Sequence, residues 1–495
     1  MAMVATVQAD ISPLLDALGA GDRARVIQQT LDLLGPRGVP PAHIAARVAI
    51  PAAWAGGDGH ALVTLGAAGR VAEWMRAIPA GPEPGADTQR QLAPALPLVQ
   101  GMMAVADRVG PGLREPHPAL PDPRTPLEIS REGIEGGVLG ALRAAFAARD
   151  RQRYAGILMG FYRTGTDYRA LLANLYATLI YRCPGGAHPL IFATGASRVL
   201  DMADWGDRVP PFIHWLVPLV VTDEPDEPFV AAARAFGEAP ENGLGWVRTR
   251  LASAREEAAG AGFRQSLGVG DATAACAAVL KALKDGASTR GVASGLALAA
   301  AERLLTVPTG DADALARAAH VLLYAHAVHT VMAQSQDPDV YPVLYTAAAA
   351  VNALPLGAAP AAASPTSTPL AGGLIAPALL RSLEHQVATG DAQSALATAR
   401  RYIQMNHAPR SLAGILGAAA ARRDAPANPH GLAAVAAAAE EYLTQPGAGW
   451  LAFSSATASQ SALLGATIRL ASELPGDTAL AQQVEAGIAA RMAGQ

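Results

Sequence analysis

Residues 21–34 read GDRARVIQQTLDLL, and residues 149–162 read RDRQRYAGILMGFY. Both stretches place apolar residues at three- and four-residue spacing, which is typical of an amphipathic helix. They align without a gap over the residues that follow, because Asp22 precedes His60 by the same interval that separates Asp150 from His188. The two segments therefore indicate a duplicated unit of helix, loop, helix, loop and a final helix that carries a histidine.

The match continues beyond the two histidines, where Arg70 corresponds to Arg198 and Glu73 to Asp201. A third copy begins at residue 270 with GDATAACAAVLKAL, and a fourth begins at residue 390 with GDAQSALATARRYI and reaches His430. Such repetition is typical of stacked helical units that share one core. The sequence predicts one domain over 1–495, a single helical array of four divergent His-bearing repeats at about 10–80, 138–206, 262–335 and 378–445.

The fold class follows from alanine-rich helical segments and from the scarcity of alternating β-branched residues. We expect an all-α protein, with glycine and proline concentrated in the connections. Residues 353–370 read ALPLGAAPAAASPTSTPL. This low-complexity stretch is predicted to be a surface linker or a mobile lid.

Composition excludes several classes of partner. The chain has 495 residues, 16% of them charged, and a formal net charge of −4, so it offers no broad basic field to nucleic acid. Apolar stretches are too short or too often broken by proline to span a membrane. Two cysteines, no disulfide framework and no visible secretion signal predict a cytoplasmic protein. The oligomeric state stays open.

Three histidines share a setting that suits metal binding. His60, His188 and His430 each lie in the first turn of an expected apolar helix, after an aspartate, a glycine pair or a proline. The positive end of a helix disfavours the imidazolium ion, and a neutral imidazole is the form that binds metals. A histidine that merely caps its helix is the alternative. Recurrence in several units favours a shared metal or catalytic centre.

The third unit offers three candidates on one helix, His320, His326 and His329. At about 100° per residue, His326 and His329 share a face, whereas His320 lies about 120° from His326. They cannot all face one ion. We predict His326 as the third-unit ligand, with His320 and His329 as alternative or outer residues, and with Asp58 and Glu302 as further candidates.

Three segments carry a family resemblance: GDGHALVTLGAAGRVAEW from residue 57, GGAHPLIFATGASRVLDMADW from residue 185 and LLYAHAVHTVM from residue 322. Together they resemble the questin oxidase-like proteins, which include fungal enzymes that oxidatively cleave rings of anthraquinone and aflatoxin-type polyketides. The resemblance implies an all-helical oxygenase in which His60, His188, His326 and His430 surround a non-haem iron that handles O2. The fungal pattern has a lysine shortly after the fourth histidine, where this chain has Ala433.

These observations predict a metal-dependent oxygenase, with iron first among the possible metals, that oxidises or cleaves a small aromatic polyketide, phenol or quinone. Imidazole ligands also suit copper, nickel and zinc. We expect an apolar substrate cavity between helices. Two alternatives remain, a non-catalytic helical scaffold and a zinc-dependent hydrolase with Asp58 or Glu302 as its base. The candidate cavity walls are Trp54, Phe192, Trp205, Phe212, Trp215 and Tyr324.

Overall fold

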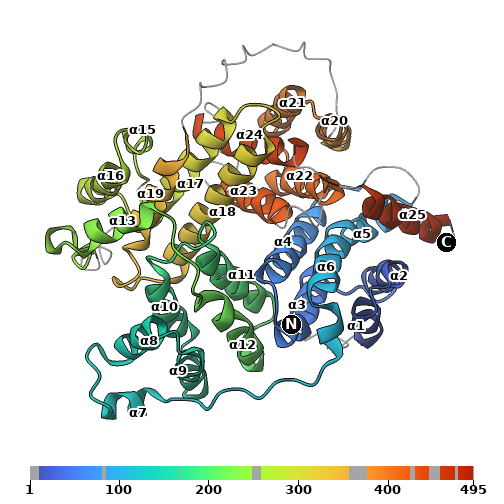
Figure 1. The fold of residues 1–495 in the computed structure, drawn as a ribbon. Helices are drawn as coiled ribbons and strands as arrows, with labels where there is room; N and C mark the ends of the chain where they lie inside the picture. Colours follow the sequence, from blue (N-terminus) through green and yellow to red (C-terminus); the bar gives the residue numbers. More distant parts are fainter. Residues whose placement is uncertain are drawn as a thin grey trace, which may run out of the picture.

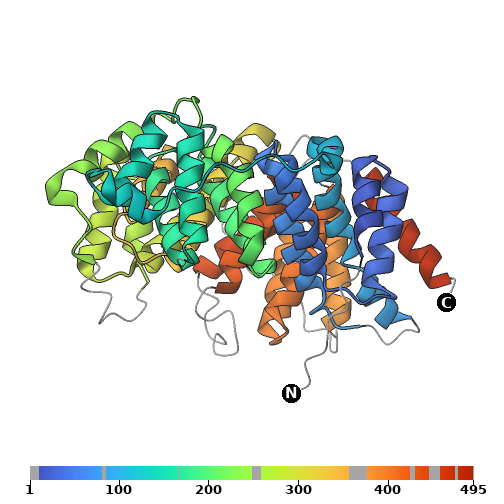
Figure 2. The same cartoon turned by 90° about the horizontal axis from the view of Figure 1, so that it is seen from below.

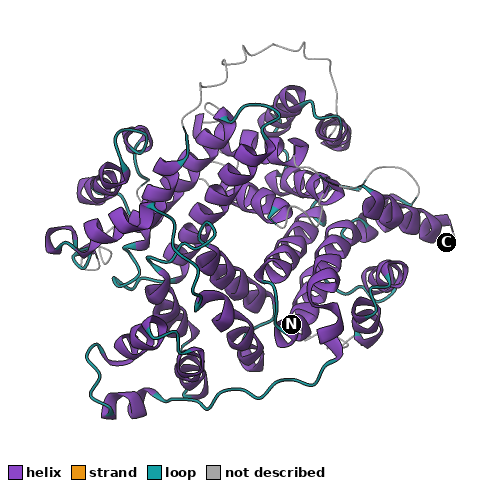
Figure 3. Ribbon diagram, in the orientation of Figure 1, coloured by secondary structure: helices purple, strands orange, loops and turns teal. Residues whose placement is uncertain are grey.

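In the structure, a computed structural model, the regular elements of the described residues are all helices, joined by loops (Figure 3). Within those residues the only bridge between extended segments pairs Pro184 with Asp226. The predicted all-α class is therefore confirmed. The described residues are 10–80, 85–165, 167–247, 258–355, 376–423, 430–444, 458–473, 476 and 478–493.

Four stretches of chain contain the same succession of helices and coincide with the four expected units. Whether they descend from one duplicated unit stays a prediction. The first two stretches are α1 (Ser12–Gly19), α2 (Arg23–Leu34), α3 (Pro41–Ala55) and α4 (Gly59–Met75), then α8 (Gly137–Ala147), α9 (Arg151–Arg163), α10 (Tyr168–Leu179) and α11 (His188–Met202). The other two are α15 (Ala261–Ser266), α16 (Ala272–Asp285), α17 (Thr289–Thr306) and α18 (Ala312–Gln334), then α20 (Ala376–Ala388), α21 (Ala392–Gln404), α22 (Pro409–Arg423) and α23 (Gly431–Thr444).

The second helix of each stretch begins in the same way. Asp22, Asp150, Asp271 and Asp391 each precede that helix, and each side chain accepts a hydrogen bond from the backbone N–H three residues later. An aspartate in this position satisfies a helix donor that has no partner within the helix. The Gly-Asp and Arg-Asp pairs that mark the aligned segments are thus helix starts.

The fourth helices of the four stretches form the centre of the molecule (Figure 1). Here α4 packs on α11, α11 on α18, α18 on α23, and α23 back on α4, which closes a ring. We call this ring the central bundle. Seen from below, the helices stand side by side in a body that is broader than it is tall (Figure 2).

The other helices connect the four stretches or cover the central bundle. They are α5 (Ala86–Leu92), α6 (Ala95–Val109), α7 (Pro126–Arg131), α12 (Val209–Val220), α13 (Phe229–Glu238), α19 (Val343–Ala353), α24 (Ala458–Glu473) and α25 (Ala479–Ala493), with short 3-10 turns at Gly110–Arg114, Gly206–Arg208 and Pro240–Asn242. Most of the predicted linker or lid at 353–370 lies outside the described residues. No described helix is long and apolar enough to cross a membrane.

Small side chains let the bundle helices approach closely. Gly66, Ala67, Gly195 and Ala436 line a cavity of about 40 Å³ to which all four helices contribute residues. A cavity of that size has room for a few water molecules, since each occupies about 10–15 Å³ on the same scale. A Cβ on Gly66 would lie 3.1 Å from Cγ2 of Val199, and one on Gly195 would lie 2.9 Å from Cγ2 of Val63, so both glycines lie where α4 and α11 pack closely.

Replacing Gly195 by alanine is expected to destabilise the protein by about 1 kcal/mol. A Cβ at this position would lie 2.9 Å from Cγ2 of Val63 on the facing helix α4, so Val63 must move. That cost outweighs the gain of about 1 kcal/mol that alanine normally brings to a helix. Urea unfolding measures the change. Gly262→Ala is the matched control, because a Cβ there meets nothing within 4 Å, and an equal effect at both positions would contradict the prediction.

Candidate metal centre

Three of the predicted histidines meet at one end of the central bundle. His60 lies in the first turn of α4, His188 is the first residue of α11, and His430 directly precedes α23. The Nε2 atom of His188 lies 3.2 Å from Nε2 of His60 and 3.0 Å from Nε2 of His430. We call these three residues the histidine centre. Their ligand atoms all lie within 4.8 Å of one another.

The spacing of the Nε2 atoms fits a shared metal ion. Two imidazole nitrogens bound at about 2.0–2.1 Å, with angles between the octahedral and tetrahedral values, lie about 2.9–3.4 Å apart. Hydrogen bonds alone fit less well, because an imidazole nitrogen carries either one hydrogen or one lone pair. The Nε2 atom of His188 faces two nitrogens at once, so it can satisfy only one of them. A cation satisfies all three lone pairs together.

Asp58 orients the first of these imidazoles. Its carboxylate accepts hydrogen bonds from the His60 backbone N–H and from Nδ1 of the same ring, and it is also paired with Arg108 of α6. A proton held on Nδ1 leaves the Nε2 lone pair free to face the other histidines. This carboxylate–histidine arrangement is typical of metal sites. Asp58, an alternative ligand in the sequence analysis, therefore contacts the Nδ1 side of His60, whereas the Nε2 side faces the other histidines.

A turn of unusual backbone conformation positions His188. Gly185, Gly186 and Ala187 precede it with φ angles of 54°, 82° and 77°. The left-handed region is costly for a residue with a side chain, about 1–2 kcal/mol at Ala187. A Cβ on Gly185 would lie 2.7 Å from Nδ1 of His188, and one on Gly186 would lie 3.1 Å from the ring of His320. The glycine pair in the sequence is thus required by the packing of these two imidazoles.

The imidazoles of the centre are held in their neutral form. Burial, with the nearby His60, lowers the pKa of His188 to about 4. Burial and the neighbouring imidazoles of His320, His60 and His188 lower the pKa of His430 to about 2, and burial also lowers that of His60. Neutral imidazole is the metal-binding form. The Nδ1 atom of His430 and the Nε2 atom of His320 are buried without a hydrogen-bond partner among the described residues.

In the third unit the structure corrects the sequence prediction, because His320 and not His326 lies beside the centre. The ring of His320 is 4.8 Å from that of His188 and 4.5 Å from that of His430, measured between centroids. Both nitrogens of His326 have other partners. Its Nδ1 lies 2.6 Å from Oε1 of Glu441, and its Nε2 lies 2.6 Å from the guanidinium of Arg198.

His326 belongs instead to a second polar cluster, which sequence reasoning missed. Glu441 is fully buried and accepts hydrogen bonds from Nδ1 of both His326 and His329. The adjacent Glu440 is paired with Arg70 at 2.5 Å and with Arg198 at 3.1 Å. Arg198 also donates to the hydroxyl of Thr330. We call these seven residues the glutamate network.

The network has a regular relation to the histidines. Arg70, Arg198, Thr330 and Glu440 follow His60, His188, His320 and His430, respectively, by ten residues each. Ten residues span about 15 Å along a helix. Since residues at both offsets meet across the bundle, α4, α11, α18 and α23 run parallel. The helices α4, α11 and α23 begin at the histidine centre, whereas α18 begins at Ala312, eight residues before His320. The correspondence of Arg70 with Arg198 in the sequence is the signal from which the glutamate network could have been predicted.

Most remaining candidates lie elsewhere. Glu302 of α17 is paired with Arg264 at 3.0 Å. Phe192 does contact the centre, since its ring stacks on His188 at 5.1 Å between centroids and packs edge-on against His60 at 5.3 Å. Trp205 stacks on Tyr168, and Tyr324 is buried beside Cys183. Phe212 and Trp215 are buried core residues, and Trp54 stacks on His117.

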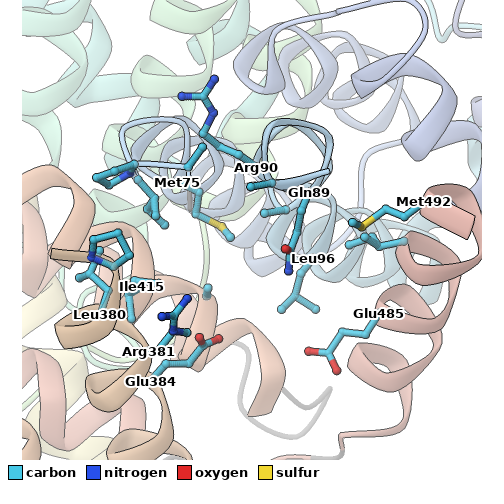
Figure 4. A pocket seen from close by; sticks show the side chains of 18 of the residues that line it. Met75, Gln89, Arg90, Leu96, Leu380, Arg381, Glu384, Ile415, Glu485 and Met492 are labelled. Atoms are coloured by element: carbon cyan, nitrogen blue, oxygen red, sulfur yellow. The ribbon is translucent and has the colours of Figure 1, made fainter. Parts of the chain in front are cut away.

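A sizeable pocket lies away from the histidines. It has a volume of about 520 Å³ and is lined mainly by apolar residues of α20, α22 and α25 and of the chain from the end of α4 to α6 (Figure 4). The pocket includes Met75, which follows His60 by about 22 Å along α4. None of the candidate histidines lines it. The predicted substrate cavity at the histidines is therefore not this pocket.

Replacing Asp58 by asparagine is expected to weaken metal binding about 10–100-fold, because the substitution removes the carboxylate that holds the Nδ1 proton of His60. Titration with Zn²⁺ against a competing chelator measures the change. Asp391→Asn is the matched control, since Asp391 also caps a helix, but it precedes α21 and accepts its hydrogen bond from the Ser394 backbone N–H. Equal affinities for the Asp58 variant and the unmodified protein would contradict this role.

Comparison with known proteins identifies no relative, because no protein-family model, curated protein or solved structure matches the chain. The resemblance to questin oxidase-like proteins therefore stays a prediction.

Proposed function

We propose that this protein is a metal-dependent oxygenase, with non-haem iron as its first candidate cofactor, and that it acts on a small aromatic substrate. The observation that carries the proposal is the convergence of three neutral imidazoles whose Nε2 atoms lie 3.0 and 3.2 Å apart. His60, His188 and His430 would hold the ion. The ring of His320 lies beside them, 4.8 Å from that of His188 and 4.5 Å from that of His430 between centroids.

The ligand set favours a catalytic metal over a purely structural one. Structural zinc sites are closed by four protein ligands, whereas catalytic sites keep a position open for water or substrate. Among the described residues, the side chains that could together hold a metal ion are the three imidazoles of the histidine centre. This ligand set contains no carboxylate and no thiolate. The imidazoles are also only partly buried, which leaves the centre accessible to small molecules.

Two observations favour an oxygenase acting on an aromatic compound. A redox-active ion held by His60, His188 and His430 would supply a site for O2 activation, and an electron-rich aromatic substrate would supply the electrons that reduce the O2. The ring of Phe192 packs against both His188 and His60, which gives the centre an aromatic wall. The resemblance to questin oxidase-like proteins points the same way. Both cysteines are free and buried, which supports a cytoplasmic protein.

The alternatives have less support. A zinc hydrolase needs a carboxylate base, but Asp58 is occupied by His60 and Arg108, and Glu302 is occupied by Arg264. A scaffold whose histidines only cap helices does not explain why three Nε2 atoms converge.

Metal analysis and O2 consumption test the proposal. The purified protein is stripped with a chelator, loaded under nitrogen with Fe²⁺ or Zn²⁺, and analysed for bound metal. We expect about one ion per chain. An oxygen electrode should then record O2 uptake by the iron form, but not by the zinc form, when phenols and quinols are added. Failure to retain any metal would support the scaffold, and metal binding without O2 uptake would contradict the oxygenase.

A further inference from the structure

We infer that the substrate binds at the histidine centre as an oxyanion, that is, as a phenolate or a related ionised aromatic hydroxyl. This inference rests on the proposed function and concerns the charge of the substrate. It follows from the electrostatic composition of the centre, from its position at the ends of three helices, and from the aromatic side chain beside it.

The first argument is the balance of charge. All three candidate ligands are neutral imidazoles, so they cancel none of the charge of a divalent ion. Among the described residues, Asp58 is the carboxylate that contacts the centre, through Nδ1 of His60. Its charge is already matched by Arg108, which is paired with its other oxygen. The positive charge of a bound ion is therefore left for the substrate to compensate.

The second argument is the orientation of the helices. Three of them begin at the centre, α4 at Gly59, α11 at His188 and α23 at Gly431. The N-terminus of a helix carries roughly half a positive charge, which favours a nearby anion and disfavours a nearby cation. The helix ends thus oppose a bare cation and favour a cation paired with an anion.

The third argument concerns the body of the ligand. Phe192 lies against His188 and His60, as described above. Its ring packs edge-on against His60 and stacks on His188, so it forms an aromatic surface at the centre itself. An ionised hydroxyl on an aromatic ring satisfies both the positive centre and this ring surface.

Binding in this form has a simple chemical balance. The hydroxyl of the free phenol loses its proton to solvent as its oxygen approaches the ion, and no electron is transferred. The bound phenol should therefore ionise at a lower pH than the free phenol. A phenol methyl ether has the same ring but no proton to lose, so it should bind poorly.

The experiment uses the zinc-loaded protein, because zinc is colourless and does not change oxidation state. 4-Nitrophenol is the probe, since its anion absorbs in the visible range and its protonated form does not. We expect the bound probe to titrate at least one pH unit below the free probe. The methyl ether 4-nitroanisole, measured by competition with 4-nitrophenol, should bind at least tenfold more weakly. The double variant His60→Ala/His188→Ala, treated with zinc in the same way, should not shift the titration.

Each outcome separates this inference from the proposed function. Binding of 4-nitrophenol in its protonated form, equal binding of 4-nitroanisole, or no binding of either probe to protein that holds zinc would overturn the oxyanion inference and leave the metal centre intact. An unchanged shift in the double variant would place the anion site away from the histidines and would also overturn it. Failure to retain zinc would instead refute the proposed function. Circular dichroism confirms that the double variant is folded.

Discussion

The variant His188→Ala is expected to lose its metal. The Nε2 atom of His188 lies between those of His60 and His430, within 3.2 Å of each, so its removal takes away the central ligand. Binding energies of about 10–16 kcal/mol for four-ligand zinc sites imply about 3–4 kcal/mol per ligand. The affinity should therefore fall about 10²–10³-fold. Metal content after gel filtration and chelator competition measure the loss.

The control for this variant is His385→Ala. His385 is exposed on α20 and is not part of the histidine centre, so its replacement should leave about one ion per chain. A second variant, His326→Ala, tests whether His326 lies outside the metal centre. It should also retain the ion, because both nitrogens of His326 face other residues. Full metal retention by His188→Ala would show that the three imidazoles do not form a metal site.

The variant Glu441→Gln is expected to lower the free energy of unfolding by about 3 kcal/mol or more. Glu441 has no exposed surface, and it accepts hydrogen bonds from His326 at 2.6 Å and from His329 at 2.8 Å. Burial opposes ionisation, yet His329 and His326 lower the pKa of Glu441 to about 2. The neutral amide removes that charge and leaves two buried imidazole donors with a single acceptor oxygen.

Urea unfolding measures this change, with Glu115→Gln as the control because Glu115 is exposed. The triple variant Glu441→Leu/His326→Leu/His329→Leu removes Glu441 together with both of its hydrogen-bond donors, while Arg198 keeps Glu440 and Thr330 as partners. It should recover much of the lost stability, since replacing a whole buried polar group by apolar residues costs less than removing one member. A Glu441→Gln variant as stable as the unmodified protein would show that the glutamate network contributes little.

The helices and their order could be predicted because their causes are local. Asp22 and Asp150 start helices by capping them, and the apolar spacing that follows requires no knowledge of the rest of the chain. The positions of His60 and His188 follow from the same alignment. These are the parts of the candidate centre for which sequence and structure agree.

The third unit could not be predicted in the same way, because the face of α18 that meets the centre depends on packing. His320 and His326 lie on one continuous helix, and sequence spacing does not determine which of them points toward α11 and α23. Glu440 and Glu441 were missed for a related reason. A pair of acids near the end of an alanine-rich helix usually lies in solvent, but α23 lies inside the central bundle, where Arg70 and Arg198 compensate Glu440.

The distances along the chain between the three converging histidines have a consequence for folding. His60 and His188 are separated by 128 residues, and His188 and His430 by 242. An ion bound by all three would cross-link these distant segments and close two very long loops, so stable loading must await the docking of α23, the last of the three helices that begin at the centre. Metal uptake would therefore report that these distant segments have docked, and an ion at 1,000 times its dissociation constant would stabilise the docked form by about 4 kcal/mol.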